Sequence, residues 1–445
     1  MNNTALTCLA KLEREHGVIE LFAFGRSTSW IALKNFLFER SVDHLSFPKV
    51  QIREFLSLQG LALFLKSLFH YLILIGRRME GAAFFGAGSG IFDYHGEILD
   101  SYLPSALEQR PGLPRPGLHY FLSATRLNAF ARYSKYLDIH RVIIFSLLVA
   151  PLRGAIYCVL RPCLPILNAK LSANATLASQ VLENHGITVS ARQILKIHAR
   201  FAAGYMAYAA LLAFVRITES YIVSAYSYSE IVAALKRKGC KVTEIQHGLV
   251  GSMHRGYNYA VKSDRLPVPD MVQVYNDFWR NELVEAGFFG QNAIEVGRRL
   301  KYVLAEAEAE DARAPYILFS GQGLLKEEIK FIRDFSSTDT KLHLITVPHP
   351  IQSPEDVNTL CEAVGNDPRI HVLTRKTCTT ERLIMNSVAH VSIFSSCHFD
   401  AIHYKGKTFV LDVIDQNIMH HYALLHPGEI ALASSAQEML AKIHA

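Results

Sequence analysis

The 445-residue sequence contains little cysteine, and its seven cysteines include no CxxC pair. An odd number without such pairs argues against a disulfide framework and a cysteine-based zinc site, and it favours a reducing compartment. No Lys/Arg run is interleaved with aromatic residues, so the net charge of +6 gives little support to nucleic-acid binding. With 50% hydrophobic residues the chain is too apolar to be disordered, and its length predicts two domains.

Several catalytic signatures are also missing. The sequence has no Walker A motif and no HExxH motif, which argues against a P-loop NTPase and a zincin. The string closest to a GxSxG nucleophile elbow is GAGSG, in which Gly88 stands directly before Ser89, so it does not match. The DxD motif with which some sugar transferases hold a metal is absent, and we expect neither a metal nor another cofactor.

The sequence also lacks a long uninterrupted hydrophobic run, although a spanning helix needs about 20 apolar residues. The nearest stretches are 61–76, which a lysine and a histidine interrupt, and 142–167, which contains two arginines and three prolines. We expect buried helices there; the alternative is peripheral contact, with apolar faces in lipid and cations at anionic headgroups. The N-terminus lacks the layout of a signal peptide, so we expect a cytoplasmic protein, with any membrane contact at the inner face.

Strand and helix patterns alternate from residue 220 onward. A strand at 221–227, a helix at 229–239 and a strand at 241–246 form a βαβ unit, which predicts a parallel sheet. The alternation continues and predicts a second doubly wound sheet. Its strands are expected at 271–276, 293–297, 316–321, 342–350, 369–374, 390–396 and 408–413. Its helices are expected at 277–287, 324–335, 381–388 and 397–406.

The N-terminal half is less regular. We expect a strand that enters a Gly-rich loop at 81–90 and a turn with a helix start at 91–105. A helical insertion is expected at about 105–215, and its helices are expected to break at three prolines, namely Pro151, Pro162 and Pro165.

These patterns together predict an α/β protein with two Rossmann-like domains. The first domain is expected at 1–265 and carries the insertion, and the second is expected at 266–430, after a Pro-bearing linker. A C-terminal helix is expected at 431–445. Ligands of parallel sheets bind at the carboxyl ends of the strands, so we expect a cleft where two such domains face each other.

A histidine follows the strand 241–246 in the motif Gln246-His247-Gly248. Such a histidine can act as a general base because its pKa lies near neutrality, and the glycine allows close approach of backbone or substrate. A histidine that is merely held by the fold is an equally good interpretation. The following segment is unusually polar and aromatic, and its candidates for the acceptor side are His254, Arg255, Tyr257 and Tyr259.

Two loops after expected strands suit a phosphate group. In Val347-Pro348-His349-Pro350, the prolines fix the backbone around His349, whose ring can then bind a phosphate oxygen or protonate a leaving group. The alternative is a turn with an incidental histidine. The loop Gly321-Gln322-Gly323 precedes a helix and suits a phosphate or a nucleoside, although a single Gly-x-Gly is a weak signal.

A third loop contains Ser395-Ser396, between an expected strand and an expected helix. Two hydroxyl groups and free backbone amides at a helix start favour an anion. A plain serine N-cap is the commoner reason for serine at this position.

The order of these motifs resembles the GT-B superfamily of bacterial surface-polymer transferases. It is similar to capsule Kdo (3-deoxy-manno-octulosonic acid) transferases, to bacterial sialyl- and polysialyltransferases, and to teichoic-acid glycerophosphotransferases. In those families an HP motif and a Ser-rich motif hold the phosphate of a cytidine nucleotide. The resemblance therefore implies that His349, Pro350, Ser395 and Ser396 bind the donor.

The base of those families lies in a short motif that ends in glycine. The motif is an acidic pair before glycine in polysialyltransferases and His-Gly in the teichoic-acid enzymes, which makes His247 the candidate base here. Gln246 completes the catalytic motif, and Glu244, on the same strand face as Gln246, is expected to orient His247. The resemblance covers about 220–412 and, weakly, 81–105.

The function implied is that of a glycosyltransferase that moves an acidic sugar, of Kdo or sialic acid type, from a CMP donor. The acceptor is a hydroxyl group of a bacterial surface glycan or of a lipid-linked molecule. One alternative is a CDP-glycerol or CDP-ribitol phosphotransferase, although Ile393-Phe394 stands where teichoic-acid enzymes usually carry Asp-Tyr. A second is a non-catalytic nucleotide-binding component of a polysaccharide assembly complex.

Overall fold

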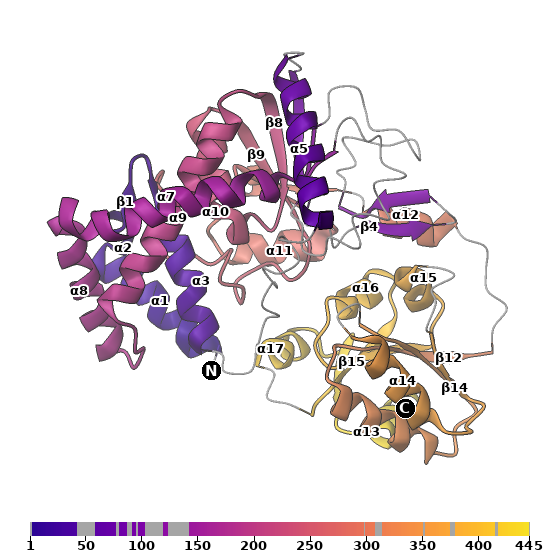
Figure 1. The fold of residues 1–445 in the computed structure, drawn as a ribbon. Coiled ribbons are helices and arrows are strands. Elements are labelled where there is room, and N and C mark those ends of the chain that lie inside the picture. The colour runs from indigo at the N-terminus through magenta and orange to yellow at the C-terminus, as the bar shows by residue number, and fades with distance from the viewer. Residues whose placement is uncertain are drawn as a thin grey trace. The chain divides into compact units, whose positions relative to one another are not determined.

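The computed structural model contains two compact units, Met1–Arg299 and Leu300–Ala445 (Figure 1). The residues it describes are 2–41, 58–76, 80–86, 91–94, 97–102, 119–122, 142–297, 299–307, 314–349, 352–373, 379–413 and 417–444. Each unit has its own parallel sheet and its own apolar clusters, so each is described by itself.

The first unit is built on a seven-stranded sheet with the order β11-β10-β9-β8-β3-β6-β7. Its strands are β3 (Glu80–Gly86), β6 (His119–Leu122), β7 (Val142–Ile143), β8 (Arg216–Val223), β9 (Lys241–Ile245), β10 (Met271–Val274) and β11 (Ile294–Val296). All of the strand pairs are parallel. The chain starts in the middle at β3, runs outward to β7 and resumes on the other side at β8, so the strand order reverses between β3 and β8. Ligands of parallel sheets bind at such a switch point.

Helices cover this sheet and extend beyond it. They are α1 (Asn2–His16), α2 (Val18–Leu21), α3 (Trp30–Ser41), α5 (Leu58–Gly76), α7 (Phe145–Leu167), α8 (Ala169–Asn184), α9 (Ala191–Leu212), α10 (Ser229–Arg237) and α11 (Asp277–Glu285), with the short 3-10 helices η2 (Ala225–Tyr228) and η3 (Gln291–Ala293). Side chains of α5, α7, α9 and α10 form one apolar cluster with the sheet, and α1, α3, α8 and the start of α9 form another. The helix α9 begins at a capping box of Ser190 and Gln193, which satisfies backbone donors at its N-terminus. Two hairpins complete the unit: β1 (Ala23–Phe24) with β2 (Ser27–Thr28), and β4 (Ile91–Tyr94) with β5 (Glu97–Asp100).

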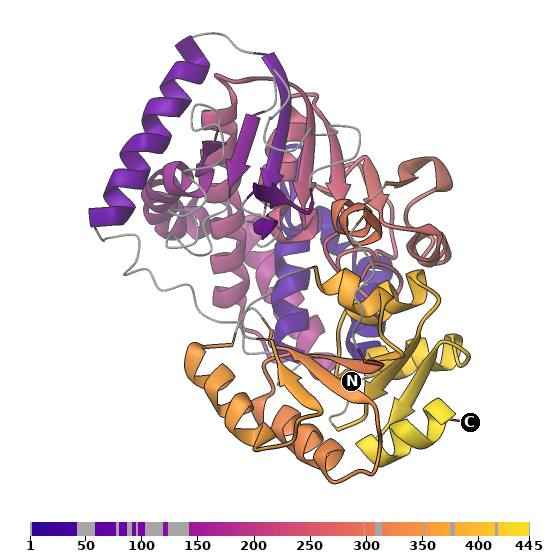
Figure 2. The ribbon, with the colours of Figure 1, turned by 90° about the vertical axis from the view of Figure 1, so that its right-hand side faces the viewer.

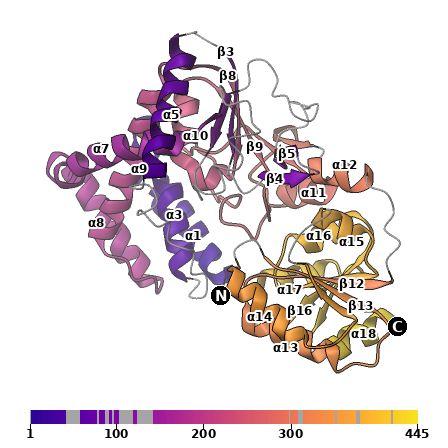
Figure 3. The ribbon, with the colours of Figure 1, turned by 45° about the vertical axis from the view of Figure 1, so that its right-hand side comes forward.

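The second unit has a six-stranded parallel sheet with the order β14-β13-β12-β15-β16-β17. Its strands are β12 (Tyr316–Ser320), β13 (His343–Val347), β14 (Ile370–Val372), β15 (Ala389–Ser392), β16 (Lys407–Leu411) and β17 (Ile430–Ala433). Its helices are α12 (Leu300–Ala307), α13 (Leu325–Ser336), α14 (Pro354–Val364), α15 (Thr380–Met385), α16 (Cys397–His403), α17 (Asn417–Leu425) and α18 (Ala436–His444). The helices α13, α14 and α18 cover one face of the sheet, and α15 and α16 cover the other (Figure 3).

The prediction of an α/β protein with two Rossmann-like parallel sheets is confirmed. The boundary expected at 265/266 is wrong, because β10 pairs with β9 and β11 pairs with β10, which keeps 271–299 in the first unit. The Pro-bearing segment taken as an interdomain linker in fact connects β9 to β10 of the same sheet.

Four local expectations also need correction. The segment 91–105 contains the β4–β5 hairpin rather than a helix start. The expected insertion at 105–215 contains β6 and β7 of the sheet, and its helical part is α7 to α9. The helix α7 continues through all three prolines at which breaks were expected. The expected helix 431–445 starts at Ala436, because Ile430–Ala433 forms the edge strand β17.

The two apolar stretches form the helices α5 and α7, which are only partly buried. Figure 2 shows α5 as the long purple helix at the edge of the first unit. Its side chains Leu61, Leu65, Phe69 and Leu72 are more than half exposed. Within the parts of the chain that the structure describes, one helix is long and apolar enough to cross a membrane, Phe145–Leu164 of α7, and only 17% of it is buried. The expectation of buried helices therefore holds only for the inner faces of α5 and α7, which pack in the apolar cluster of the sheet, and it is wrong for their outward faces.

Candidate functional site

In the first unit, the candidate residues gather where β8 and β9 end. The two strands pair in parallel with Ile222 opposite Glu244, so their carboxyl ends lie side by side. The chain leaves β8 through Ser224, whose φ of 61° is left-handed and unusual for a residue with a Cβ. This turn brings Tyr226 next to His247, which follows β9.

His247 and Tyr226 form the central pair of this site. The Tyr226 hydroxyl lies 3.2 Å from Nε2 of His247, and the two rings are 5.7 Å apart. Nδ1 of His247 is buried and has no hydrogen-bond partner. Burial lowers the pKa of His247 to about 4, so the ring is neutral at neutral pH and able to accept a proton.

Glu244 does not orient His247, contrary to the sequence-based expectation. Its Oε1 accepts hydrogen bonds from the Ala225 amide at 3.0 Å and from the Tyr257 hydroxyl at 2.7 Å. Burial raises the pKa of Glu244 to about 7. The carboxyl group acts on Tyr257, whose ring packs edge-on against Tyr226 at 5.8 Å, so its influence on His247 passes through two tyrosines.

The segment after His247 wraps around the Tyr226 ring. The His254 ring packs edge-on against it at 4.7 Å, and Nδ1 of His254 accepts the Gly256 amide at 3.1 Å. The Arg255 guanidinium lies 5.7 Å from the centre of the same ring. A Cβ on Gly256 would lie 2.5 Å from Cγ of Tyr226, so this position requires glycine.

Asn35 of α3 closes the same group of side chains. Its Oδ1 accepts the Arg255 Nε–H at 3.1 Å, and its Nδ2 donates to the Tyr226 carbonyl at 2.8 Å. Three of the four acceptor-side candidates, His254, Arg255 and Tyr257, are thus brought together around Tyr226.

Tyr259 and Gln246 have other places. Tyr259 is buried in the cluster of α1, α3 and α8, with Nζ of Lys34 4.3 Å from its ring centre. The amide group of Gln246 is used within the fold: its Nε2 donates to the Gly248 carbonyl at 2.8 Å and its Oε1 accepts the Tyr275 amide at 2.9 Å. Gln246 ties the end of β9 to the end of β10, and we assign it no contact with substrate.

In the second unit, the candidate loops follow β12, β13 and β15. The strand order reverses between β12 and β15, so the loops after these two strands lie at the switch point, and the β13 loop is adjacent. The structure brings His349 to the Gly321 loop: the His349 amide nitrogen is 3.3 Å from where a Cβ of Gly321 would lie. Pro350 lies outside the described residues, as does the loop 87–90 after β3.

The backbone amides of the loop Gly321-Gln322-Gly323 are already used by a side-chain carboxylate of the protein itself. Oε1 of the buried Glu328 accepts the amides of Gln322, Gly323 and Leu324 at 2.6, 2.9 and 3.3 Å. These donors are therefore not free for a phosphate group, which corrects the expectation for Gln322 and Gly323. The other oxygen of Glu328 accepts Nε2 of Gln352, whose Oε1 accepts the His349 amide, so Glu328 fixes both loops.

The two serines after β15 differ in their contacts. Oγ of Ser395 accepts the Cys397 amide at 3.2 Å, a local turn contact. Ser396 precedes α16, and its hydroxyl makes no capping hydrogen bond. Of the pair, Ser396 is the residue whose hydroxyl is not used by this helix start.

Beneath these loops lies a buried polar group that the sequence did not reveal. His390 of β15 contacts the Thr408 hydroxyl at 2.8 Å and the Ser320 hydroxyl at 3.0 Å. Nδ1 of His398, in α16, contacts the same Thr408 hydroxyl at 2.6 Å. The group links β12, β15 and β16 to α16. In the described part of the chain no three His, Cys, Asp or Glu side chains gather as a metal-binding set.

No model of a known protein family matches this chain, and no curated protein does. Among solved structures it is similar to the UDP-GlcNAc 2-epimerase from Neisseria meningitidis bound to UDP-GlcNAc, with 12% identity over 60% of this chain and 78% of that chain and a TM-score of 0.38. Another UDP-N-acetylglucosamine 2-epimerase is 10% identical over 82% of this chain and 86% of that chain, with a TM-score of 0.43. The calicheamicin glycosyltransferase CalG4 is 10% identical over 53% of this chain and 65% of that chain, with a TM-score of 0.36. At these identities and TM-scores the likenesses carry no conclusion about what this chain does.

Proposed function

We propose that this protein is a glycosyltransferase that moves an acidic sugar, of Kdo or sialic acid type, from a CMP donor to a hydroxyl group. The acceptor is a bacterial surface glycan or a lipid-linked molecule, and the enzyme works in the cytoplasm at the inner membrane face. The observation that carries the proposal is the geometry of His247, held beside the Tyr226 hydroxyl at the carboxyl edge of a parallel sheet. A histidine at such a place can take the proton of an acceptor hydroxyl.

In the proposed reaction, the acceptor hydroxyl gives its proton to the Tyr226 hydroxyl as its oxygen attacks the anomeric carbon, and the Tyr226 hydroxyl passes its own proton to Nε2 of His247. The bond between that carbon and the phosphate oxygen of CMP breaks, and its electron pair leaves with the phosphate. In the second unit, His349 and Ser396 donate hydrogen bonds to this phosphate, which stabilises the charge that develops there. The proposal includes no metal and no other cofactor.

His247→Ala is the variant that tests the base. We expect product formation to be lost while CMP still binds in isothermal titration, since His247 and the donor loops belong to different units. The control is His371→Ala, which removes an exposed histidine from the edge strand β14. Transfer by His247→Ala at the wild-type rate would mean that His247 is not the base.

The pH dependence gives a second test of the base. Because burial lowers the pKa of His247 to about 4, the ring stays neutral down to mildly acidic pH. We expect the acid limb of kcat/KM near pH 4 rather than near 6.5, the ordinary value for histidine. If the acid limb of kcat/KM lay at about pH 6.5 and stayed there in Tyr226→Phe, the burial of His247 beside Tyr226 would be contradicted.

A donor panel tests the substrate class. The wild-type protein is incubated with CMP-Kdo, CMP-sialic acid, CDP-glycerol or UDP-sugars, each with an oligosaccharide or lipid-linked acceptor, and the products are analysed. Transfer from a CMP-sugar alone supports the proposal, and transfer from CDP-glycerol supports the polyol-phosphate alternative. A thermal shift with CMP and no product from any donor would indicate the non-catalytic alternative.

A further inference from the structure

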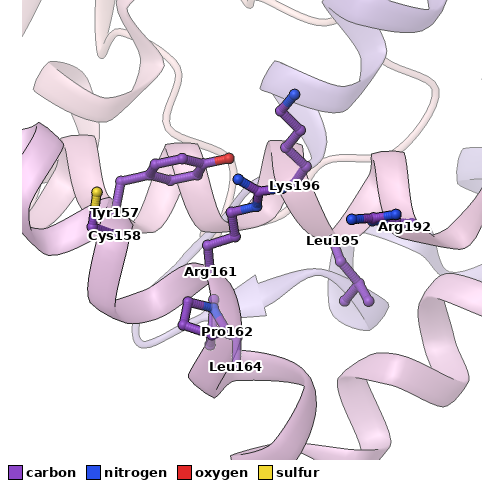
Figure 4. Close-up of a pocket in the computed structure, with 8 residues that line it drawn as sticks. All are labelled: Tyr157, Cys158, Arg161, Pro162, Leu164, Arg192, Leu195 and Lys196. Carbon is purple, nitrogen blue, oxygen red and sulfur yellow. The ribbon is translucent and has the colours of Figure 1, made fainter.

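A second polar site lies between α7 and α9 of the first unit. It is a cavity of about 550 Å³. Its lining includes Tyr157, Cys158 and Arg161 from α7, with Arg192, Leu195 and Lys196 from α9 (Figure 4). None of these residues contributes to the group around His247, and the proposed reaction does not use them.

The cavity is strongly cationic. Arg161, Arg192 and Lys196 are exposed side chains that line it, and none of the residues that line it is acidic (Figure 4). Over the described ranges of the chain, none of the three forms an ion pair with a carboxylate. Arg192 also stands in the first turn of α9, which contains no acidic residue, although a helix N-terminus favours negative charge. Three cations at this place leave an uncompensated positive potential.

A buried hydroxyl group adds an independent observation. The Tyr157 hydroxyl is inaccessible to solvent and has no hydrogen-bond partner. Figure 4 shows it pointing toward the guanidinium group of Arg161. Buried hydroxyl groups in folded proteins nearly always have a partner, so this one is a donor available to a group that enters the cavity. Two guanidinium groups, an ammonium group and a phenol form a donor set that fits a phosphate group.

The outward face of α7 beside this cavity is apolar. Val159 and Ile166 are 64% and 81% exposed. Ala155, Cys158 and Pro162 are exposed as well, and the spacing of these five residues places them on one face of the helix. An apolar helix face bordered by cations is the pattern of a helix that lies in a membrane interface.

We propose that the cavity between α7 and α9 binds the headgroup phosphate of an anionic phospholipid, while the outward face of α7 lies in the adjoining acyl region. The first unit would thereby dock on an anionic membrane surface. Charge complementarity selects this occupant, because the cavity offers three cations and a free hydroxyl directly beside exposed aliphatic side chains. The inference does not depend on the proposed transferase chemistry.

Flotation of the full chain with vesicles tests this proposal. The vesicles contain phosphatidylcholine alone or an equal mixture with phosphatidylglycerol. We expect the double variant Arg192→Gln/Lys196→Gln to bind the mixed vesicles about 30-fold more weakly than wild type, from the usual contribution of two cations at such a surface. The control Lys326→Gln/Lys330→Gln removes the same charge from exposed positions of α13, and it should bind as wild type does.

Two single variants separate the headgroup contact from the lipid contact. Tyr157→Phe should weaken binding to mixed vesicles, because it removes only the unpartnered hydroxyl. Ile166→Ser should weaken binding by about tenfold or more through the loss of buried aliphatic area. Both act without loss of transferase activity on a soluble acceptor, so their outcome is independent of the proposed reaction.

Three outcomes would overturn the proposal. The first is equal binding of the pocket and control double variants to mixed vesicles. The second is a thermal shift of the wild type, but not of Arg192→Gln/Lys196→Gln, with inorganic phosphate and no vesicle binding, which would mean a free-anion site. The third is a smaller oligomer for Ile166→Ser in light scattering without vesicle binding by the wild type, which would make the face a contact between two copies.

Discussion

Replacing Gly256 by alanine should damage both the stability of the first unit and the candidate site. The new Cβ would lie 2.5 Å from Cγ of Tyr226 and 2.8 Å from its Cβ and Cδ1. Carbon atoms pack at about 3.5 Å or more, so the ring has to move by about 1 Å. The ring is held by His254, Arg255 and Tyr257, which leaves it little room.

The cost can be worked from this geometry. Overpacking of a filled interior costs about 1–3 kcal/mol, which we expect as the loss in free energy of unfolding. The bond between Tyr226 and His247 is already 3.2 Å long, and a shift of about 1 Å would take it beyond hydrogen-bonding distance. Misplacement of a reacting group by that amount can lower the rate about 100-fold, and we expect such a loss in kcat/KM.

The unfolding assay can be confined to the first unit. Both tryptophans of the chain, Trp30 and Trp279, are buried in that unit, so urea unfolding followed by tryptophan fluorescence reports on it alone. The control is Gly290→Ala, because a Cβ there meets no atom within 4 Å and the backbone φ is −76°. The reasoning about close packing would be refuted if Gly256→Ala unfolded at the same urea concentration as the control.

Three further predictions concern buried carboxylates. Glu13→Gln should lower the free energy of unfolding by about 3–5 kcal/mol in the same urea assay. The substitution leaves the charge of the buried Lys34, whose Nζ lies 2.8 Å from the Glu13 carboxylate, without its partner. An unchanged free energy of unfolding would contradict this. Glu328→Ala should speed hydrogen exchange of the amides at 322–324, measured by mass spectrometry, whereas the neighbouring Glu327→Ala should not. Burial raises the pKa of Glu244 to about 7 from 4.5, so the folded state holds this proton more tightly and the stability it contributes falls as the pH rises between those values. Relative to wild type, Glu244→Gln should therefore gain up to about 3 kcal/mol between about pH 4.5 and 7.5, whereas a difference that is constant with pH would contradict the shift.

The architecture could be predicted largely because parallel strands carry a strong local signal. Strands such as β9 and β12 are buried on both faces, so they are short apolar runs bounded by polar turns. The pairing of strands depends on residues far apart in the sequence, and this is why the domain boundary was misplaced. The residues of Met271–Val274 alone do not indicate whether this strand pairs with β9 or with a strand of the second unit. The two-residue strand β7 and the short edge strand β17 carry too few residues for a period to show.

The candidate site could be predicted in part for the same reason. His247 was found because it follows a strand directly, and the position of a residue after a strand places it at a sheet edge. Its partner Tyr226 was missed because 221–227 was expected to be one strand. The strand ends at a left-handed residue, Ser224, and no glycine marks this turn in the sequence. The assignment of Glu244 failed because alternation along a strand gives the face of a side chain but not its hydrogen-bond partner.

Buried polar groups under the sheet edges hold the loops of each unit in place. In the first unit Glu244 receives two donors, and in the second Glu328 receives three backbone amides and the Gln352 side chain. Burial of a carboxylate costs folding free energy unless hydrogen-bond donors surround it. The same hydrogen bonds hold the donor groups, and therefore the loops, in place. Because Glu328 occupies these three backbone amides, the proposed reaction assigns the donor phosphate to the side chains of His349 and Ser396 instead. Through Gln352, the same carboxylate also fixes the backbone of the His349 loop.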